Sequence, residues 1–227
     1  MSPSALIVFA KVPEPGKVKT RLTELLTPTQ AAELYTAFLA DALAQYAALD
    51  VDVRLYLPPS DKTMPAGVVP EPVSRQAQVG ADLGARMGHA FLETFMAGYK
   101  KAVIIGTDHP TLPSPFIDEA FRILDDPYAI SIGPSEDGGY YLLGMNEFYP
   151  HLFEGMTYSH DQVFMQTLER AGETGAEVTV LPPWFDVDTP DELVRLAREL
   201  PDADPEALPR TREVLGRLAK AYAALRG

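Results

Sequence analysis

Short runs of purely apolar residues recur along the chain and alternate with stretches of helical periodicity. The first run, ALIVFA at 5–10, contains no polar residue, which is typical of a strand covered on both faces of a sheet. Residues 102–105 form a similar run, whereas 29–48 places Leu34, Phe38 and Tyr46 at helical spacing. Strands that alternate with helices predict a mostly parallel sheet with helices on both faces, and therefore an α/β fold.

The same patterns continue along the rest of the chain. They predict strands at 51–57, 128–133, 140–145 and 176–181, and helices at 81–97, 113–125, 159–171, from 189 onward and at 209–225, with 58–75 interpreted as a loop. Residues 1–200 are interpreted as a single domain and 201–227 as a C-terminal linker and helix. Parallel sheets bind ligands at the carboxyl ends of their strands, so the motifs that follow the strands are the candidates for function.

Composition narrows the class of protein. The net charge is −13, from 19 basic and 32 acidic residues, which argues against a nucleic-acid partner because nucleic-acid backbones require a basic surface. The absence of cysteine excludes disulfides, thiol nucleophiles and thiolate metal sites. The first apolar run is cut short by Lys11 and has no basic segment before it, so we expect no membrane span and no signal peptide. We expect a cytoplasmic protein of unknown oligomeric state.

A basic loop follows the first predicted strand. It contains one glycine, Gly16, and four cationic side chains in an acidic protein: Lys11, Lys17, Lys19 and Arg21. A glycine lets backbone amides approach a ligand, so we interpret this loop as a phosphate-binding cradle, the alternative being a solvated surface loop.

Two familiar phosphate motifs do not fit this loop. A P-loop requires a glycine where Lys11 stands and a Ser or Thr where Val18 stands. A dinucleotide fingerprint requires three spaced glycines after the strand, and this loop has only Gly16. The chain is therefore neither an ordinary P-loop NTPase nor a Rossmann dehydrogenase.

Two aspartates are candidates for holding a metal ion. Asp108 follows the apolar run at 102–105, where a carboxylate points into the ligand crevice, and Asp188 precedes a predicted helix. Hard oxygen ligands suit Mg²⁺ or Mn²⁺, which bridge to phosphate oxygens. The structural alternatives are a turn at Asp108, which lies two residues before Pro110, and an N-terminal capping role for Asp188.

A third motif, Asp137-Gly138-Gly139, lies between the predicted strands at 128–133 and 140–145. The sequence Asp-Gly is a common hairpin turn, which is the structural alternative. An aspartate beside glycines also allows an acceptor to come close to the backbone, and Asp137 is then an acceptor-binding group or base.

Taken together, these motifs resemble those of bacterial GT-A-like glycosyltransferases, a family of nucleotide-diphospho-sugar transferases of uncertain substrate. The resemblance covers the chain up to about 198 and depends on four segments in order: 9–11 with 15–22, 106–110, 133–141 and 186–190. The family is similar, more distantly, to molybdenum-cofactor and phospholactate guanylyltransferases and to sugar-nucleotide cytidylyltransferases.

The resemblance implies a three-layer α/β sandwich with a mostly parallel, mixed sheet of the nucleotide-diphospho-sugar transferase fold. It implies that Asp108 and Asp188 hold Mg²⁺ or Mn²⁺ and that the four cations of the first loop lie near phosphates, with Gly16, Gly138 and Gly139 at the nucleotide-binding surface. The partners it implies are a nucleotide sugar or an NTP and a small acceptor.

Three functions are consistent with these features. The first is metal-dependent transfer of a sugar from a nucleotide-diphospho-sugar to a small acceptor, with Asp137 at the acceptor. The second is nucleotidyl transfer from an NTP to a phosphorylated metabolite with release of pyrophosphate, whose usual glycine-rich opening loop is reduced here to Gly16. The third is a non-catalytic sensor of nucleotide sugars.

Overall fold

The computed structural model describes residues 4–204 and 206–222. Its single sheet has seven strands in the order β3-β2-β1-β4-β6-β5-β7, and the two pairings made by β6 are antiparallel while the others are parallel. The strands are β1 (Ser4–Phe9), β2 (Asp52–Leu57), β3 (Ser74–Ala77), β4 (Lys101–Ile105), β5 (Ala129–Pro134), β6 (Tyr140–Met145) and β7 (Glu177–Val180). The predicted three-layer fold with a mixed, mostly parallel sheet is confirmed.

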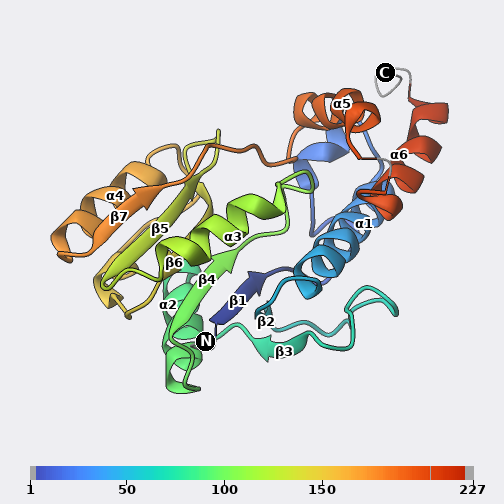
Figure 1. The fold of residues 1–227 in the computed structure, drawn as a ribbon. Coiled ribbons are helices and arrows are strands. Elements are labelled where there is room, and N and C mark those ends of the chain that lie inside the picture. The colour runs from blue at the N-terminus through green and yellow to red at the C-terminus, as the bar shows by residue number, and fades with distance from the viewer. Residues whose placement is uncertain (1–3, 205, 223–227) are drawn as a thin grey trace.

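The helices cover both faces of this sheet (Figure 1). They are α1 (Pro28–Ala47), α2 (Leu83–Met96), α3 (Ser114–Ile123), α4 (Val163–Glu173), α5 (Pro190–Glu199) and α6 (Pro209–Ala221), with short 3₁₀ helices η1 (Thr20–Glu24), η2 (Pro150–Leu152) and η3 (Leu200–Asp202). No helix among residues 4–204 and 206–222 is long and apolar enough to cross a membrane.

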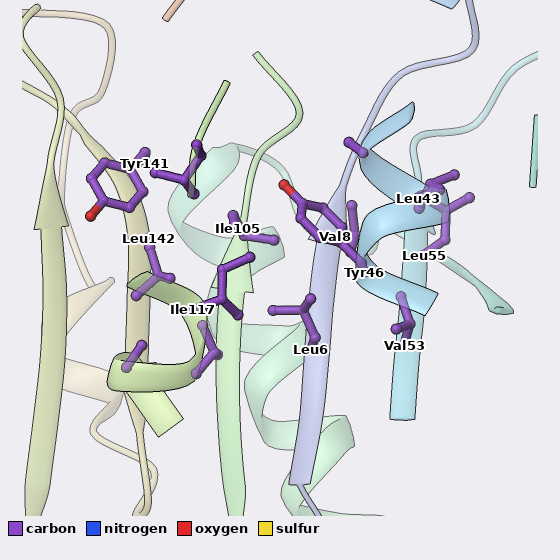
Figure 2. Packing of buried hydrophobic residues seen from close by; sticks show 14 of the residues in the cluster. Leu6, Val8, Leu43, Tyr46, Val53, Leu55, Ile105, Ile117, Tyr141 and Leu142 are labelled. Carbon is purple, nitrogen blue, oxygen red and sulfur yellow. The ribbon is translucent and has the colours of Figure 1, made fainter. Parts of the chain in front are cut away.

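Alternate residues of the central strands pack on opposite helical layers, as the two-residue period of a strand requires. Leu6 and Val8 belong to the core under α1 and α3, whereas Ile7 belongs to the core under α2 and α4. Figure 2 shows the first of these cores, in which side chains of β1, β2 and β4 meet those of α1 and α3. Burial on both faces explains why these strands are purely apolar in sequence.

The helix predicted at 209–225 ends at Ala221, and residues 223–225 lie outside the described part of the chain. The sequence predictions differ more clearly from the structure at two other elements. Residues 58–75 were interpreted as a loop, but their end begins the edge strand β3, whose residues Ser74–Ala77 are mostly exposed. The helix predicted from 159 begins at Val163 instead. Ser159 adopts a left-handed conformation with φ 69°, and the His160 Nδ1 accepts a hydrogen bond from the backbone N–H of Gln162, so a turn occupies the expected first helical turn.

The C-terminal helix α6 packs beside α1, at the same end of the molecule as α5 (Figure 1). Its N-cap residue, Leu208, makes no side-chain capping bond. A residue of another helix caps the first turn instead. The buried carboxylate of Asp41 on α1 accepts hydrogen bonds from the backbone N–H groups of Arg210 (3.2 Å) and Thr211 (2.8 Å). A negative charge at this end also complements the helix dipole.

We therefore expect Asp41→Ala to lower the free energy of unfolding by about 1–2 kcal/mol, the loss typical of a helix cap. Urea unfolding monitored by circular dichroism measures the change. Asp50→Ala, at an exposed aspartate just beyond α1, is the matched control and should have almost no effect. Equal effects of the two variants would contradict the capping role of Asp41.

Candidate active site

The order of the strands places a crevice between β1 and β4. From β1 the chain continues to β2 and β3 on one side of the sheet, while β4 lies on the other side of β1. The two neighbours run parallel with Val8 opposite Ile105, so the loops that follow them leave the sheet side by side. In open α/β sheets this reversal of strand order is the usual ligand-binding position.

The two predicted metal-binding aspartates meet at this crevice, on either side of one lysine. The Lys19 Nζ donates a hydrogen bond to the Asp188 Oδ1 at 2.8 Å and also forms an ion pair with the Asp108 Oδ1. The lysine side chain is 2% exposed, whereas the carboxylates of Asp108 and Asp188 are 46% and 39% exposed. The ammonium thus approaches from inside the protein, and the carboxylates remain open to solvent.

Local backbone and packing turn Lys19 inward. The residue has a left-handed conformation, with φ 47° and ψ 43°, directly before η1. Its ammonium lies 6.0 Å from the centre of the Tyr35 ring and 5.8 Å from that of Phe38, both on α1. Burial by itself would lower the pKa of Lys19, but the charges of Asp108 and Asp188 outweigh it and raise the pKa, so the side chain is a cation at every physiological pH.

Backbone contacts fix the positions of the two aspartates. The backbone N–H of Val187 donates to the carbonyl oxygen of Asp108 at 2.7 Å, which ties the loop after β4 to the segment before α5. Thr189 caps α5 by accepting from the backbone N–H of Glu192. The capping alternative for Asp188 is therefore wrong, and its carboxylate contacts Lys19 instead.

A second polar group lies behind these aspartates and was not recognised in the sequence. The buried His109 ring places its Nδ1 3.5 Å from the Asp186 Oδ1. The Ser135 hydroxyl donates to the Asp186 Oδ2 at 2.7 Å. All three residues lie inside motifs that the sequence singled out, yet only the folded chain brings them into contact. They join the loop after β4, the end of β5 and the segment before α5.

The same contacts define an acid-sensitive component of stability. Burial by itself would raise the pKa of Asp186, but the His109 ring, the Ser135 hydroxyl and the charge of Lys19 together lower it below its usual value. A carboxyl with a lowered folded-state pKa stabilises the folded protein above its unfolded-state pKa, and this stabilisation is lost as the pH falls through the folded-state pKa.

We therefore expect the wild type to have a higher free energy of unfolding than Asp186→Asn. This difference should be largest above about pH 4 and should shrink as the pH falls further. Urea unfolding of both proteins between pH 2.5 and 7 measures this difference, with Asp118→Asn as an exposed control. A difference between wild type and Asp186→Asn that is constant over this whole range would contradict the assignment.

Part of the basic loop lines a cavity of about 590 Å³, whereas Gly16 and Arg21 are not among its lining residues. Lys11 and Lys17 line it, together with Glu14 and the segment from Pro58 to Asp61. Lys17 pairs with Glu14 at 2.9 Å, Gly16 forms the turn with φ 79°, and the Arg21 side chain is exposed on η1. The loop thus offers cations to an anionic ligand at Lys11 and Lys17, while Lys19 is directed elsewhere.

Tyr35 connects this cavity to the aspartates. Its hydroxyl accepts a hydrogen bond from the backbone N–H of Lys11 at 2.9 Å and lies 3.4 Å from the Thr107 Oγ1, next to Asp108. Burial, with the nearby charge of Asp108, raises the pKa of Tyr35 to about 12, so the hydroxyl keeps its proton at neutral pH. The cavity and the carboxylate pair are therefore neighbouring parts of one site.

The hairpin between β5 and β6 brings Asp137 to the same edge of the sheet. The backbone N–H of Gly138 donates to the Ser135 carbonyl, which is the turn that Asp-Gly predicts. The exposed Asp137 accepts at its Oδ1 from the backbone N–H of Gly139 at 2.9 Å. Gly138 packs against the backbone of Asp161, where an added Cβ would lie 2.2 Å from the carbonyl oxygen. The lack of a side chain at Gly138 therefore allows it to contact the backbone of Asp161.

The carboxylate oxygens of Asp108 and Asp188 suit a hard divalent cation such as Mg²⁺. Asp108 and Asp188 present partly exposed carboxylates that already surround a cation, and Mg²⁺ commonly uses one or two carboxylates with water and phosphate oxygens. Within the described part of the chain, no group of three or more His, Asp or Glu side chains is placed to hold a metal ion. A metal at this pair would therefore take most of its remaining ligands from water and substrate.

Comparison with known proteins gives the fold and the family. A crystal structure from Desulfovibrio desulfuricans G20, provisionally assigned as a nucleotide-diphospho-sugar transferase, is 37% identical, with a TM-score of 0.89 over 100% of this chain and 98% of that one. A cytidylyltransferase from Leptospira borgpetersenii serovar Hardjo-bovis shares the fold at 9% identity, with a TM-score of 0.55 over 100% of this chain and 98% of that one.

A 4-diphosphocytidyl-2C-methyl-D-erythritol synthase from Anaerococcus prevotii DSM 20548 also shares the fold, at 8% identity and a TM-score of 0.53 over 88% of this chain and 99% of that one. No curated protein matches the chain.

The chain thus has the fold of nucleotide-diphospho-sugar transferases. Residues 40–160 match the family described as "Uncharacterized protein conserved in bacteria (DUF2064)". The chain belongs to this family.

Proposed function

We propose that this protein is a metal-dependent glycosyltransferase that moves the sugar of a nucleotide-diphospho-sugar to a small acceptor. The observation that carries the proposal is the pair of half-exposed carboxylates, Asp108 and Asp188, held together by Lys19 where the strand order reverses. The cavity lined by Lys11 and Lys17 is linked through Tyr35 to Thr107, next to Asp108, and its cations suit the diphosphate of such a donor.

In this proposal Asp108 and Asp188 hold Mg²⁺ or Mn²⁺, which would neutralise charge on the leaving diphosphate. Lys11 and Lys17, at the cavity, bind phosphate oxygens, and preorganised charges of this kind are commonly worth several kcal/mol in the transition state. Gly16 lets the backbone of the loop turn at this point.

Asp137 is assigned to the acceptor. The oxygen of an acceptor hydroxyl forms a bond to the anomeric carbon of the sugar, while the bond between that carbon and the diphosphate oxygen breaks. The acceptor proton passes to the Asp137 carboxylate, and the nucleoside diphosphate leaves. Asp137 is exposed and its Oδ1 already accepts from Gly139, so the carboxylate is oriented by its own turn and accessible to an incoming hydroxyl.

A thermal-shift panel of UDP-, GDP- and CDP-sugars and the matching NTPs, each with and without Mg²⁺ or Mn²⁺, tests the proposal. A ligand that binds only the folded state raises the melting temperature by mass action. Stabilisation by one nucleotide sugar that requires metal and exceeds that by its NTP is the expected result. A preference for the free NTP would point to nucleotidyl transfer, and tight binding without turnover of any acceptor would point to a sensor.

A further inference from the structure

One buried ammonium, that of Lys19, forms ion pairs with two carboxylates at the site. The Lys19 Nζ contacts the Oδ1 atoms of both Asp108 and Asp188, and it lies on their inner side, where solvent does not reach. Two negative charges and one positive charge leave a net charge of −1. The pair is therefore half neutralised before any ligand arrives.

The protein holds this ammonium in place. The side chain of Lys19 is only 2% exposed, and its ammonium lies near the rings of Tyr35 and Phe38. Its backbone is anchored as well, because the carbonyl oxygen of Lys19 accepts from the backbone N–H of Leu22 at 3.0 Å in η1. Moving the ammonium away from the carboxylates would cost its two ion pairs, so we expect it to remain there when a second cation approaches.

We propose that Lys19 is a resident counter-ion that competes with the divalent cation for Asp108 and Asp188, so that the metal binds firmly only together with a diphosphate. This inference rests on the proposed function. A divalent ion that approaches the exposed side of the carboxylates is repelled by the ammonium behind them, and at such short range this repulsion is strong. A diphosphate brings its own negative charges, which offset the repulsion.

The competition is measured with Mn²⁺ alone, titrated into the wild type and Lys19→Met and followed by electron paramagnetic resonance of free Mn²⁺. Methionine keeps an apolar chain of similar length between Tyr35 and Phe38 but removes the charge. We expect Lys19→Met to bind Mn²⁺ about tenfold or more tightly than the wild type. Lys100→Met removes the same charge from an exposed residue at the opposite, amino-terminal end of β4 and should bind like the wild type.

The joint binding of metal and diphosphate has its own readout. Repeating the Mn²⁺ titrations with saturating UDP, GDP or CDP should tighten binding more in the wild type than in Lys19→Met. Thermal unfolding adds a readout independent of affinity. In EDTA, Lys19→Met should melt below the wild type because its two carboxylates repel each other, and Mn²⁺ alone should restore more of its stability than it adds to the wild type.

Lys19→Gln, whose amide still donates to the carboxylates, provides the same loss of charge if the methionine variant does not fold. The inference is overturned if the neutral variants bind Mn²⁺ no more tightly than the wild type while all of them bind it with a nucleotide. If no protein binds Mn²⁺ with or without a nucleotide, the metal assignment of the proposed function fails along with it. The two failures are thus distinguishable.

Discussion

Asp108→Asn is expected to lower kcat/KM for the nucleotide sugar by about a thousandfold, with almost no change in the folded structure. Asparagine has the same shape as aspartate but lacks its charge, so the pair would lose half of its attraction for a divalent cation. A thousandfold loss corresponds to about 4 kcal/mol of transition-state stabilisation, which is within the range of metal and electrostatic catalysis. Steady-state kinetics with the donor identified by the thermal-shift panel measures the effect.

Two controls separate loss of charge from loss of fold. The carbonyl oxygen of Asp108, which accepts from the backbone N–H of Val187, is unchanged in the variant, so the two loops should stay joined. Asp125→Asn removes an exposed carboxylate that pairs with Lys101 and is expected to keep full activity. Activity of Asp108→Asn equal to that of the wild type, with the same requirement for metal, would rule out the proposed site.

The fold could be predicted from sequence because its central strands are buried on both faces. Such strands require continuous apolar residues, and the run at 5–10 needs no knowledge of its neighbours to be recognised. The edge strand β3 offers no such signal. Its sequence is SRQA, and its strand conformation depends on pairing with β2, where Arg75 lies opposite Leu55. A strand that forms through pairing with a neighbouring strand, and not through burial, has no apolar run by which its sequence could be recognised.

The site was predictable in position but not in its contacts. Asp108 and Asp188 could be singled out because each lies at an end of a predicted element on the ligand-binding edge. The ion pair between Lys19 and Asp188 joins residues 169 positions apart and depends on a left-handed conformation at Lys19. Local sequence therefore indicated a phosphate-binding lysine, and its inward direction emerged only from the fold.

The contact between the buried His109 and the partly buried Asp186 is a second example of a contact that only the fold reveals. Neither residue has a local pattern that distinguishes it from an exposed loop residue, and the contact depends on the backbone bond between Val187 and Asp108 that brings the two loops together. The one sequence signal is position, because His109 directly follows Asp108 and Asp186 lies two residues before Asp188.

Gly138→Ala is the second substitution for which we expect a large effect, and it separates a structural role of this glycine from a ligand-binding one. Gly138 has φ 89°, which disfavours any side chain, and an added Cβ would lie 2.2 Å from the carbonyl oxygen and 2.5 Å from the carbonyl carbon of Asp161. Backbone cannot rotate away as a flexible side chain can. Conformational strain and overpacking together should lower the free energy of unfolding by about 3 kcal/mol.

Gly139→Ala is the matched control one residue further along the same turn. The nearest atoms to its added Cβ belong to the Asp137 carboxylate, with the Oδ1 at 3.1 Å, and its backbone is not in the left-handed region. We expect Gly139→Ala to be folded and nearly as stable as the wild type, although its Cβ crowds the Asp137 carboxylate, so its stability alone serves as the control for Gly138→Ala. Equal stability of the two variants would contradict the structural role of Gly138.

The same pair of variants tests how the hairpin supports Asp137. The carbonyl oxygen of Gly138 accepts from the backbone N–H of Phe164 at 2.9 Å, so the turn is fastened to the start of α4 as well as to Asp161. Pushing the hairpin away from this segment should displace the Asp137 carboxylate and raise KM for the acceptor more than for the donor. A larger increase in KM for the donor would place the glycines at the nucleotide instead, as the family resemblance implies.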